Sequence, residues 1–124
     1  LYPGTGMADE IGAGMGQGTT LNFPLRRGSG LESYAPVWER GGQLIDEFAP
    51  ELVIVSAGFD AHRDDPLGGM ELVAGDFAQL LRTTKQWAEN WCDGKIVCVL
   101  EGGYNYEALG DSVAAVTKEL MRDD

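Results

Sequence analysis

The stretch LVIVSAGFD, at residues 52–60, decides the fold. It is a short apolar run, rich in β-branched residues, that breaks at glycine and then presents one carboxylate, Asp60. The stretch KIVCVLEGGYN, at residues 95–105, has the same form and presents the phenol of Tyr104. Because a helix-length segment separates the two runs, we predict neighbouring parallel strands of one sheet. Their continuously apolar sequences are typical of strands that are buried on both faces.

Both polar side chains come just after a predicted strand. Ligands of open α/β sheets bind outside the carboxyl ends of the strands. Asp60 and Tyr104 are therefore expected at one edge of the sheet, facing the same crevice. A carboxylate and a phenol in that position indicate a metal ligand and a hydrogen-bond donor to a developing oxyanion.

The rest of the chain shows strand and helix periodicity in turn. Residues 20–25 are predicted to form a short strand, and a turn follows at 28–30. Helices are predicted at 33–48, 75–91 and 106–120, and strands at 52–57 and 96–100. This order predicts an α/β fold, a parallel sheet with flanking helices. Residues 1–19 are glycine-rich and lack periodicity, which is typical of a loop that lines a site within a larger fold.

Composition limits the classes of function. The chain has 124 residues, enough for one domain, and a formal net charge of -11. Direct nucleic-acid binding is not expected without a basic patch. The net charge would suit a cationic substrate, but acidic residues spread along the whole chain are more typical of an ordinary acidic surface. No apolar run is long enough for a membrane span and no signal peptide is visible, so a cytoplasmic location is expected. Cys98 lies in a strand pattern and is predicted to be a core residue.

Four motifs in order along the chain resemble the zinc-dependent histone deacetylase superfamily, in particular its bacterial class II-like branch with the acetylpolyamine amidohydrolases. They are LYPGTG at 1–6, LNFPL at 21–25, GFDA at 58–61 with DPLGG at 65–69, and EGGYN at 101–105. The match covers nearly the whole chain. The resemblance implies an arginase/deacetylase-like fold, in which residues 1–124 are the C-terminal portion of a histone deacetylase-like domain.

The resemblance also implies an activity, the hydrolysis of N-acyl amides of lysine or polyamines, with zinc as cofactor. Asp60 matches the carboxylate that ligates the zinc, and Tyr104 matches the catalytic tyrosine that donates to the oxyanion. The positions that match the tunnel for the acyl-lysine chain are Tyr2, Leu67, Gly102 and Gly103. The chemistry is consistent with these roles, because a metal ion and an O–H donor both stabilise negative charge on an attacked carbonyl oxygen.

The chain departs from the family pattern in its metal ligands. A catalytic zinc has about three protein ligands, and the family takes two of them from an upstream Asp-x-His motif and its general base from an upstream His-His pair. Neither motif occurs in this sequence, in which His62 is the only histidine. The isolated chain is therefore expected to bind zinc weakly or not at all and to be inactive. We also expect it to self-associate through surfaces left by the missing part.

Two alternative functions stay open at this point. The first is a non-catalytic, truncated remnant that folds or self-associates without enzymatic activity. The second is an acidic protein-interaction module, which would explain the net charge but not the ordered motifs.

The triplet Asp60-Ala61-His62 imitates an Asp-x-His ligand pair. The residues on both sides of it match the later motif of the family, in which the third position is not a ligand. We therefore expect His62 to be a solvent-facing loop residue. Asp64 and Asp65 are expected to cap or brace the loop rather than to bind metal.

Overall fold

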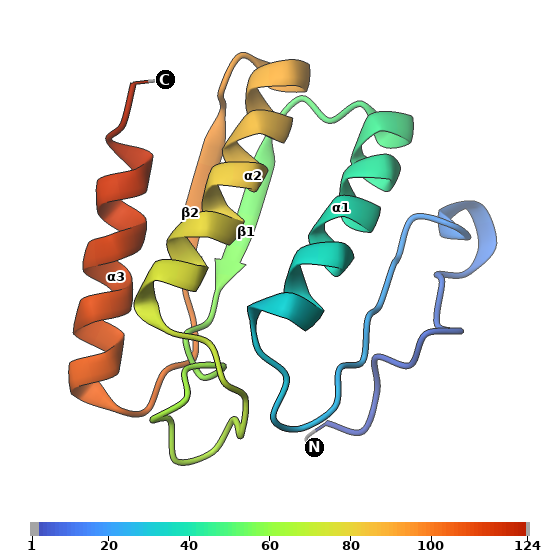
Figure 1. Ribbon diagram of the computed structural model, residues 1–124. Helices are drawn as coiled ribbons and strands as arrows, with labels where there is room; N and C mark the ends of the chain where they lie inside the picture. Colours follow the sequence, from blue (N-terminus) through green and yellow to red (C-terminus); the bar gives the residue numbers. More distant parts are fainter. Residues whose placement is uncertain (1–2, 124) are drawn as a thin grey trace.

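A computed structural model describes residues 3–123 of the chain, in which helices and strands alternate (Figure 1). The elements are the short 3-10 helix η1 (Gly14–Gly16), the helices α1 (Leu31–Phe48), α2 (Ala74–Cys92) and α3 (Tyr106–Leu120), and the strands β1 (Val53–Ala57) and β2 (Ile96–Leu100). The two strands pair in parallel, with Val53 opposite Ile96 and Ala57 opposite Leu100. The predicted fold class, α/β with a parallel sheet and flanking helices, is confirmed.

The ends of the helices follow local sequence signals. α3 begins after Asn105, whose side-chain oxygen accepts a hydrogen bond from the Ala108 N–H at 3.0 Å. α1 ends at Ala49, which adopts a left-handed conformation with φ 51° just before Pro50. The predicted helices and strands lie within two residues of the observed bounds, with the exception of the strand predicted at 20–25.

Residues 20–25 do not form a strand, and they have no regular secondary structure. In Figure 1 this segment lies beyond α1, on the side away from β1. A strand needs a neighbouring strand to take its backbone hydrogen bonds, and the described part of the chain places none beside this segment. The prediction was wrong because an apolar pattern indicates strand propensity but says nothing about the strand that must pair with it.

The core lies between one face of the sheet and the helices. α2 lies between α1 and α3 and contacts both of them (Figure 1). Val53 and Val55 of β1 and Ile96 of β2 pack against the buried Ala88 and Cys92 of α2. These apolar contacts hold the sheet to its central helix.

A second core cluster supports the end of β1. Phe59, Leu81 and Val116 are buried there, and Phe77 packs edge-on against Phe59 with the ring centroids 5.1 Å apart. Because Phe59 directly precedes Asp60, this cluster anchors the first loop that leaves the sheet.

The opposite face of the sheet is uncovered within residues 3–123. Ile54, Val97 and Val99 alternate with the core residues and are 64%, 47% and 50% exposed. Ile54 and Val97 lie opposite each other across the two strands. The prediction that both faces are buried was therefore wrong for the described residues. An apolar strand sequence indicates a face suited to burial, but not which element covers it.

The contact between α1 and α2 involves three tryptophans, one of which is Trp91, whose Nε1–H donates to the Asp46 carboxylate at 2.7 Å. The Trp38 Nε1–H donates to the Thr84 hydroxyl at 3.0 Å. Trp87 packs over Gly42 in the middle of α1, where a Cβ atom would lie 2.8 Å from the indole nitrogen. A glycine inside a helix costs about 1 kcal/mol relative to alanine, and this packing explains its presence there.

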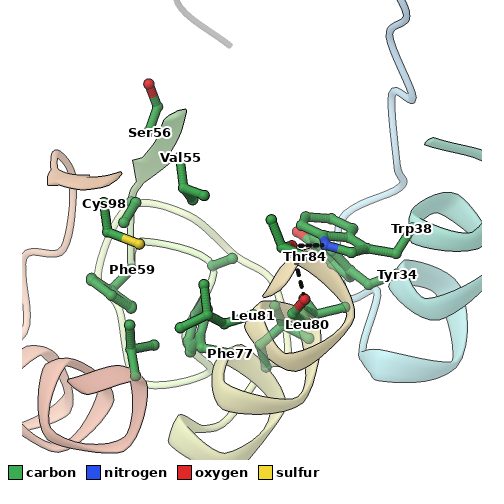
Figure 2. A pocket seen from close by; sticks show the side chains of 15 residues that line it. Tyr34, Trp38, Val55, Ser56, Phe59, Phe77, Leu80, Leu81, Thr84 and Cys98 are labelled. Carbon is green, nitrogen blue, oxygen red and sulfur yellow. Dashed lines mark hydrogen bonds between the residues drawn. The ribbon is translucent and has the colours of Figure 1, made fainter. Parts of the chain in front are cut away.

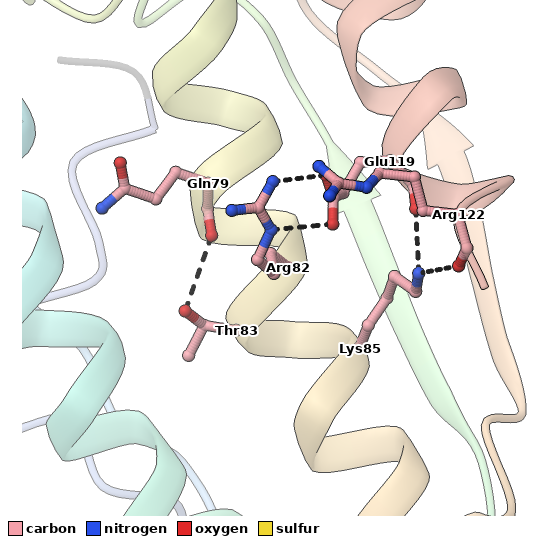
Figure 3. Close-up of polar contacts among 6 residues, drawn as sticks. All are labelled: Gln79, Arg82, Thr83, Lys85, Glu119 and Arg122. Atoms are coloured by element: carbon pink, nitrogen blue, oxygen red, sulfur yellow. Dashed lines mark hydrogen bonds and ion pairs between the residues drawn. The ribbon is translucent and has the colours of Figure 1, made fainter. Parts of the chain in front are cut away.

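A buried carboxylate joins α2 to α3 (Figure 3). Glu119 is 3% exposed and accepts two hydrogen bonds from Arg82, at 3.0 and 2.9 Å. These bonds from Arg82 hold the pKa of Glu119 below its ordinary value, although burial opposes them. The Lys85 ammonium donates to the carbonyl oxygens of Glu119 and Arg122 at 2.9 and 2.8 Å, which satisfies carbonyls at the end of α3.

Glu119→Gln should lower the free energy of unfolding by about 1–3 kcal/mol, because it removes the charge from a buried carboxylate that is bound at both oxygens. Glu107→Gln, an exposed change on the same helix, is the matched control and should have little effect. Denaturant unfolding at neutral pH measures both variants.

The pH dependence gives a second readout for the same pair of variants. The pKa of Glu119 is lower in the folded chain, so its stabilising effect is complete above the ordinary glutamate pKa. The effect is lost as the pH falls through the lower, folded-state pKa. Glu119→Gln should therefore lose less stability in acid than the wild-type chain or the Glu107 control. An equal acid loss in all three proteins would contradict this role.

Self-association stays a prediction, and the uncovered face of the sheet is the surface we expect it to use. The double change Ile54→Lys and Val99→Lys should reduce it, because it places two charges on that face. Met121→Lys is the control, since Met121 is 77% exposed but lies after α3. Sedimentation velocity over a range of concentrations measures the result. A wild-type chain that stays monomeric at all concentrations would contradict the prediction.

Candidate active site

The loops that follow β1 and β2 stay joined beyond the ends of the strands. The Glu101 N–H donates to the Ala57 carbonyl at 3.0 Å, and the Phe59 N–H donates to the Gly102 carbonyl at 2.8 Å. Asp60, one residue further along, therefore lies against Gly102 of the other loop. The two loops share one edge of the sheet, as their position after parallel strands predicted.

Asp60 lies in a cradle of glycines. A Cβ atom at Gly102 would lie 2.9 Å from both Cγ and Oδ2 of Asp60, and one at Gly58 would lie 3.1 Å from Oδ1. A Cβ atom at Gly68 would overlap the Asp60 carbonyl. The half-buried carboxylate has no hydrogen bond or ion pair among the described residues. Its oxygens are thus free to accept a donor or to ligate a cation.

A cleft of about 360 Å³ opens beside Asp60. Its walls include Tyr34 of α1, and Arg27 and Leu25 from the segment before that helix. Burial raises the pKa of the Tyr34 phenol, and the negative charge of Asp60 raises it further. The sequence did not mark Tyr34 or Arg27 as site residues, because Tyr34 lies in a predicted helix and Arg27 in the basic pair between the predicted strand and the turn at 28–30.

Tyr104 stands on a backbone that only glycine can form. The preceding Gly103 has φ 134°, and a Cβ atom there would lie 2.9 Å from Cδ1 of Leu109. The Tyr104 side chain is 54% exposed, and its hydroxyl makes no hydrogen bond among the described residues. Leu67, a predicted tunnel residue in the loop after β1, is 60% exposed. Tyr2, also predicted to line the tunnel, lies outside the described residues.

Asp65 braces the loop, as predicted. It is 8% exposed, and its Oδ1 accepts hydrogen bonds from the N–H groups of Leu67 and Gly68 at 2.8 and 3.0 Å. Its Oδ2 accepts a hydrogen bond from the Tyr104 N–H at 2.8 Å. Burial by itself raises the pKa of Asp65, but these three donors and the nearby His62 lower it more, so that it lies below the ordinary value.

The prediction that His62 faces solvent was wrong, because the side chain is only 10% exposed. The loop turns back so that its backbone forms a parallel bridge between His62 and Leu72. The His62 Nδ1 accepts a hydrogen bond from the Asp64 N–H at 3.2 Å. The side chain of Asp64, by contrast, is 65% exposed.

An apolar cavity of about 140 Å³ lies behind the Asp60 loop, between α1, α2 and the sheet (Figure 2). Trp38, Phe59 and Leu80 are among its lining residues, and no charged side chain lines it. Cys98 also reaches it and packs against the core, consistent with its predicted core position. Burial raises the pKa of the Cys98 thiol, which disfavours the reactive thiolate form.

The described residues supply part of a metal site at most. Among them, no three His, Cys, Asp or Glu side chains lie together as a group that could hold a metal ion. Asp60 fits as a single oxygen ligand, because its carboxylate is exposed to the cleft and unpaired. A zinc ion needs about two further protein ligands, which residues 3–123 do not place beside it.

Gly102→Ala should lower the free energy of unfolding by about 1–3 kcal/mol, because its Cβ atom would force the Asp60 carboxylate or the loop to move. Gly110→Ala is the matched control: it lies in α3, and a Cβ atom there meets nothing within 4 Å. That change should be neutral or should stabilise the chain by up to about 1 kcal/mol. Thermal unfolding of both variants is the measurement, and equal effects would contradict the cradle.

The family model for the histone deacetylase domain matches residues 1–120. Histone deacetylase 14, chloroplastic, of Arabidopsis thaliana is 42% identical over 127 residues, which cover 99% of this chain and 29% of that protein. A probable deacetylase of Archaeoglobus fulgidus is 44% identical over 108 residues, which cover 86% of this chain and 30% of that protein. The crystal structure of the HDA15 HD domain aligns with a TM-score of 0.87 and 37% identity, covering 98% of this chain and 34% of that one.

The chain thus spans between 29% and 34% of the length of these proteins. Within residues 3–123, no helix has the length and apolar character needed to cross a membrane. One of the relatives is named as chloroplastic, and the cytoplasmic location expected here stays a prediction. The match over residues 1–120 and the shared structure confirm the resemblance drawn from the motifs: the chain belongs to the histone deacetylase family and forms part of its domain.

Proposed function

We propose that the chain is the C-terminal part of the catalytic domain of a zinc-dependent deacetylase, which hydrolyses N-acyl amides of lysine or polyamines. By itself the chain is inactive, since the other zinc ligands and the general base belong to the rest of that domain. The observation that carries the proposal is the unpaired Asp60 carboxylate, held by glycines beside the loop of Tyr104. A carboxylate left free at the ligand-binding edge of a parallel sheet is suited to a metal.

Zinc at this position would supply Lewis-acid chemistry, which polarises the carbonyl oxygen of the amide. The contribution of Asp60 is one anionic oxygen ligand at a fixed place. Hydrogen bonds of the loop backbone hold that place, so the side chain needs little reorganisation to bind.

Tyr104 acts on the substrate rather than on the metal. Its phenol donates a hydrogen bond to the carbonyl oxygen as negative charge develops there. The hydroxyl is free for this role, since it makes no hydrogen bond among the described residues. The chain's share of the tunnel consists of Leu67, Gly102 and Gly103, together with Tyr2, which lies outside the described residues. The exposed Leu67 side chain would contact the methylene groups of the substrate.

The alternative is a non-catalytic remnant that self-associates. The exposed apolar face formed by Ile54, Val97 and Val99 favours it, because a face of this kind is suited to cover by another protein surface. The two functions differ in the complete domain, where only the first predicts hydrolysis of an acylated lysine peptide or polyamine.

In the complete domain, Asp60→Ala should remove the zinc, and Tyr104→Phe should keep it but lower kcat by about 10²–10³-fold, the usual effect of removing one oxyanion donor. Tyr106→Phe is the matched control, because Tyr106 lies two residues further along and is 88% exposed. Zinc content by mass spectrometry and the kinetics of deacetylation measure the three variants.

Two results would contradict the assignments. Full activity of Tyr104→Phe would exclude the oxyanion role, and normal zinc content of Asp60→Ala would exclude the ligand role. The isolated chain gives a separate check, since it should hold less than one zinc per chain and show no activity.

A further inference from the structure

One buried carboxylate joins the loop after β1 to the loop after β2. Both oxygens of Asp65 are in use, Oδ1 with two N–H groups of its own loop and Oδ2 with the N–H of Tyr104. The Oδ2 bond is the contact between Asp65 and the loop after β2. Its donor is the backbone N–H of Tyr104, the residue that carries the phenol.

We propose that Asp65 is a positioning residue, which fixes the backbone of Tyr104 against the loop of Asp60 and so sets where the phenol can lie. The catalytic consequence rests on the proposed function. The structural part, the bond between the carboxylate and the Tyr104 backbone, does not.

The backbone at Tyr104 needs such a bond. Gly102 and Gly103 precede it, and glycine leaves the chain free to adopt many conformations. The side chain of Tyr104 cannot hold itself in place, because it is 54% exposed and its hydroxyl has no hydrogen bond among the described residues. The position of the phenol therefore depends on its own N–H group and on the residues next to it.

Other hydrogen bonds hold the residues on either side of Tyr104. The Phe59 N–H binds the Gly102 carbonyl before it, at 2.8 Å. After it, the Asn105 side-chain amide donates to the Asp64 carbonyl at 3.0 Å. The Asp65 bond lies between these two and is the one made to Tyr104 itself, so its loss should free that residue more than its neighbours.

The chemistry of the bond requires a carboxylate rather than an amide. Asparagine has nearly the same size, but its side-chain nitrogen donates hydrogen bonds and cannot accept one. In Asp65→Asn the single oxygen should stay with the two donors Leu67 and Gly68, which leaves the nitrogen facing the Tyr104 N–H. The substitution thus breaks the bond between the loops and keeps the bonds within one loop.

Amide hydrogen exchange of the chain, followed by NMR, tests the proposal directly. In the wild-type chain the Tyr104 amide should exchange slowly. In Asp65→Asn it should exchange about tenfold to a hundredfold faster, the usual effect of losing a hydrogen bond to a charged group, while Leu67 and Gly68 change less. Asp64→Asn is the matched control, with the same chemistry at the exposed neighbouring position, and it should leave the Tyr104 amide unchanged.

Fast exchange of the Tyr104 amide in the wild-type chain would overturn the proposal. An unchanged rate in a folded Asp65→Asn chain would also overturn it. If Asp65→Asn does not fold, the wild-type rate alone decides, with the amides of β2 in the same spectrum as the reference for a protected backbone.

Kinetics of the complete domain test the catalytic consequence. Asp65→Asn should lower kcat by about tenfold or more, as expected when a reacting group is misplaced, with zinc content and KM little changed. The effect of Tyr104→Phe should be smaller in the Asp65→Asn background, because both changes act on the same phenol. Unchanged kcat together with faster exchange would overturn the positioning role. A wild-type domain without deacetylase activity would contradict the proposed function, while the exchange result would still decide the bond.

Discussion

The parallel pairing of β1 with β2 is the constraint on which the candidate site depends. It brings the carboxyl ends of two strands together, although a whole helix separates them along the chain. The backbone bonds of Phe59 and Glu101 continue the pairing for two more residues. Asp60 and the segment that leads to Tyr104 thereby become neighbours through main-chain hydrogen bonds, which do not depend on the identity of either side chain.

Helices cover only one face of the sheet within the described residues, and this explains which contacts stabilise the fold. Because the main contacts among the helices pass through α2, the core is concentrated under that helix, and further hydrogen bonds hold the outer helices to it. Trp38 binds α1 to Thr84, and Glu119 binds α3 to Arg82. The other face keeps β-branched residues exposed, so the same strands that build the site also present an uncovered apolar face.

Local patterns were enough to predict the elements and the edge of the sheet where the loops meet. The helical period gave the three helices, and the runs before Asp60 and Tyr104 gave the paired strands. The strand prediction for residues 20–25 was wrong because a strand forms only beside a partner strand, and no local sequence pattern shows whether that partner is present. The prediction for His62 was wrong for a related reason: the residue is buried in a loop that turns back on itself and bridges its backbone to Leu72, which no local pattern shows.

The bracing role of Asp65 followed from turn chemistry, but its bond to Tyr104 could not, because that bond crosses between loops that are far apart in the sequence. The whole site shows a similar contrast, between its main chain and its side chains. Backbone hydrogen bonds and one buried carboxylate fix the main chain, whereas the side chains of Asp60 and Tyr104 make no hydrogen bonds of their own among the described residues. Such a site is fixed in its main chain and leaves its polar side chains available to a metal, a substrate or further protein.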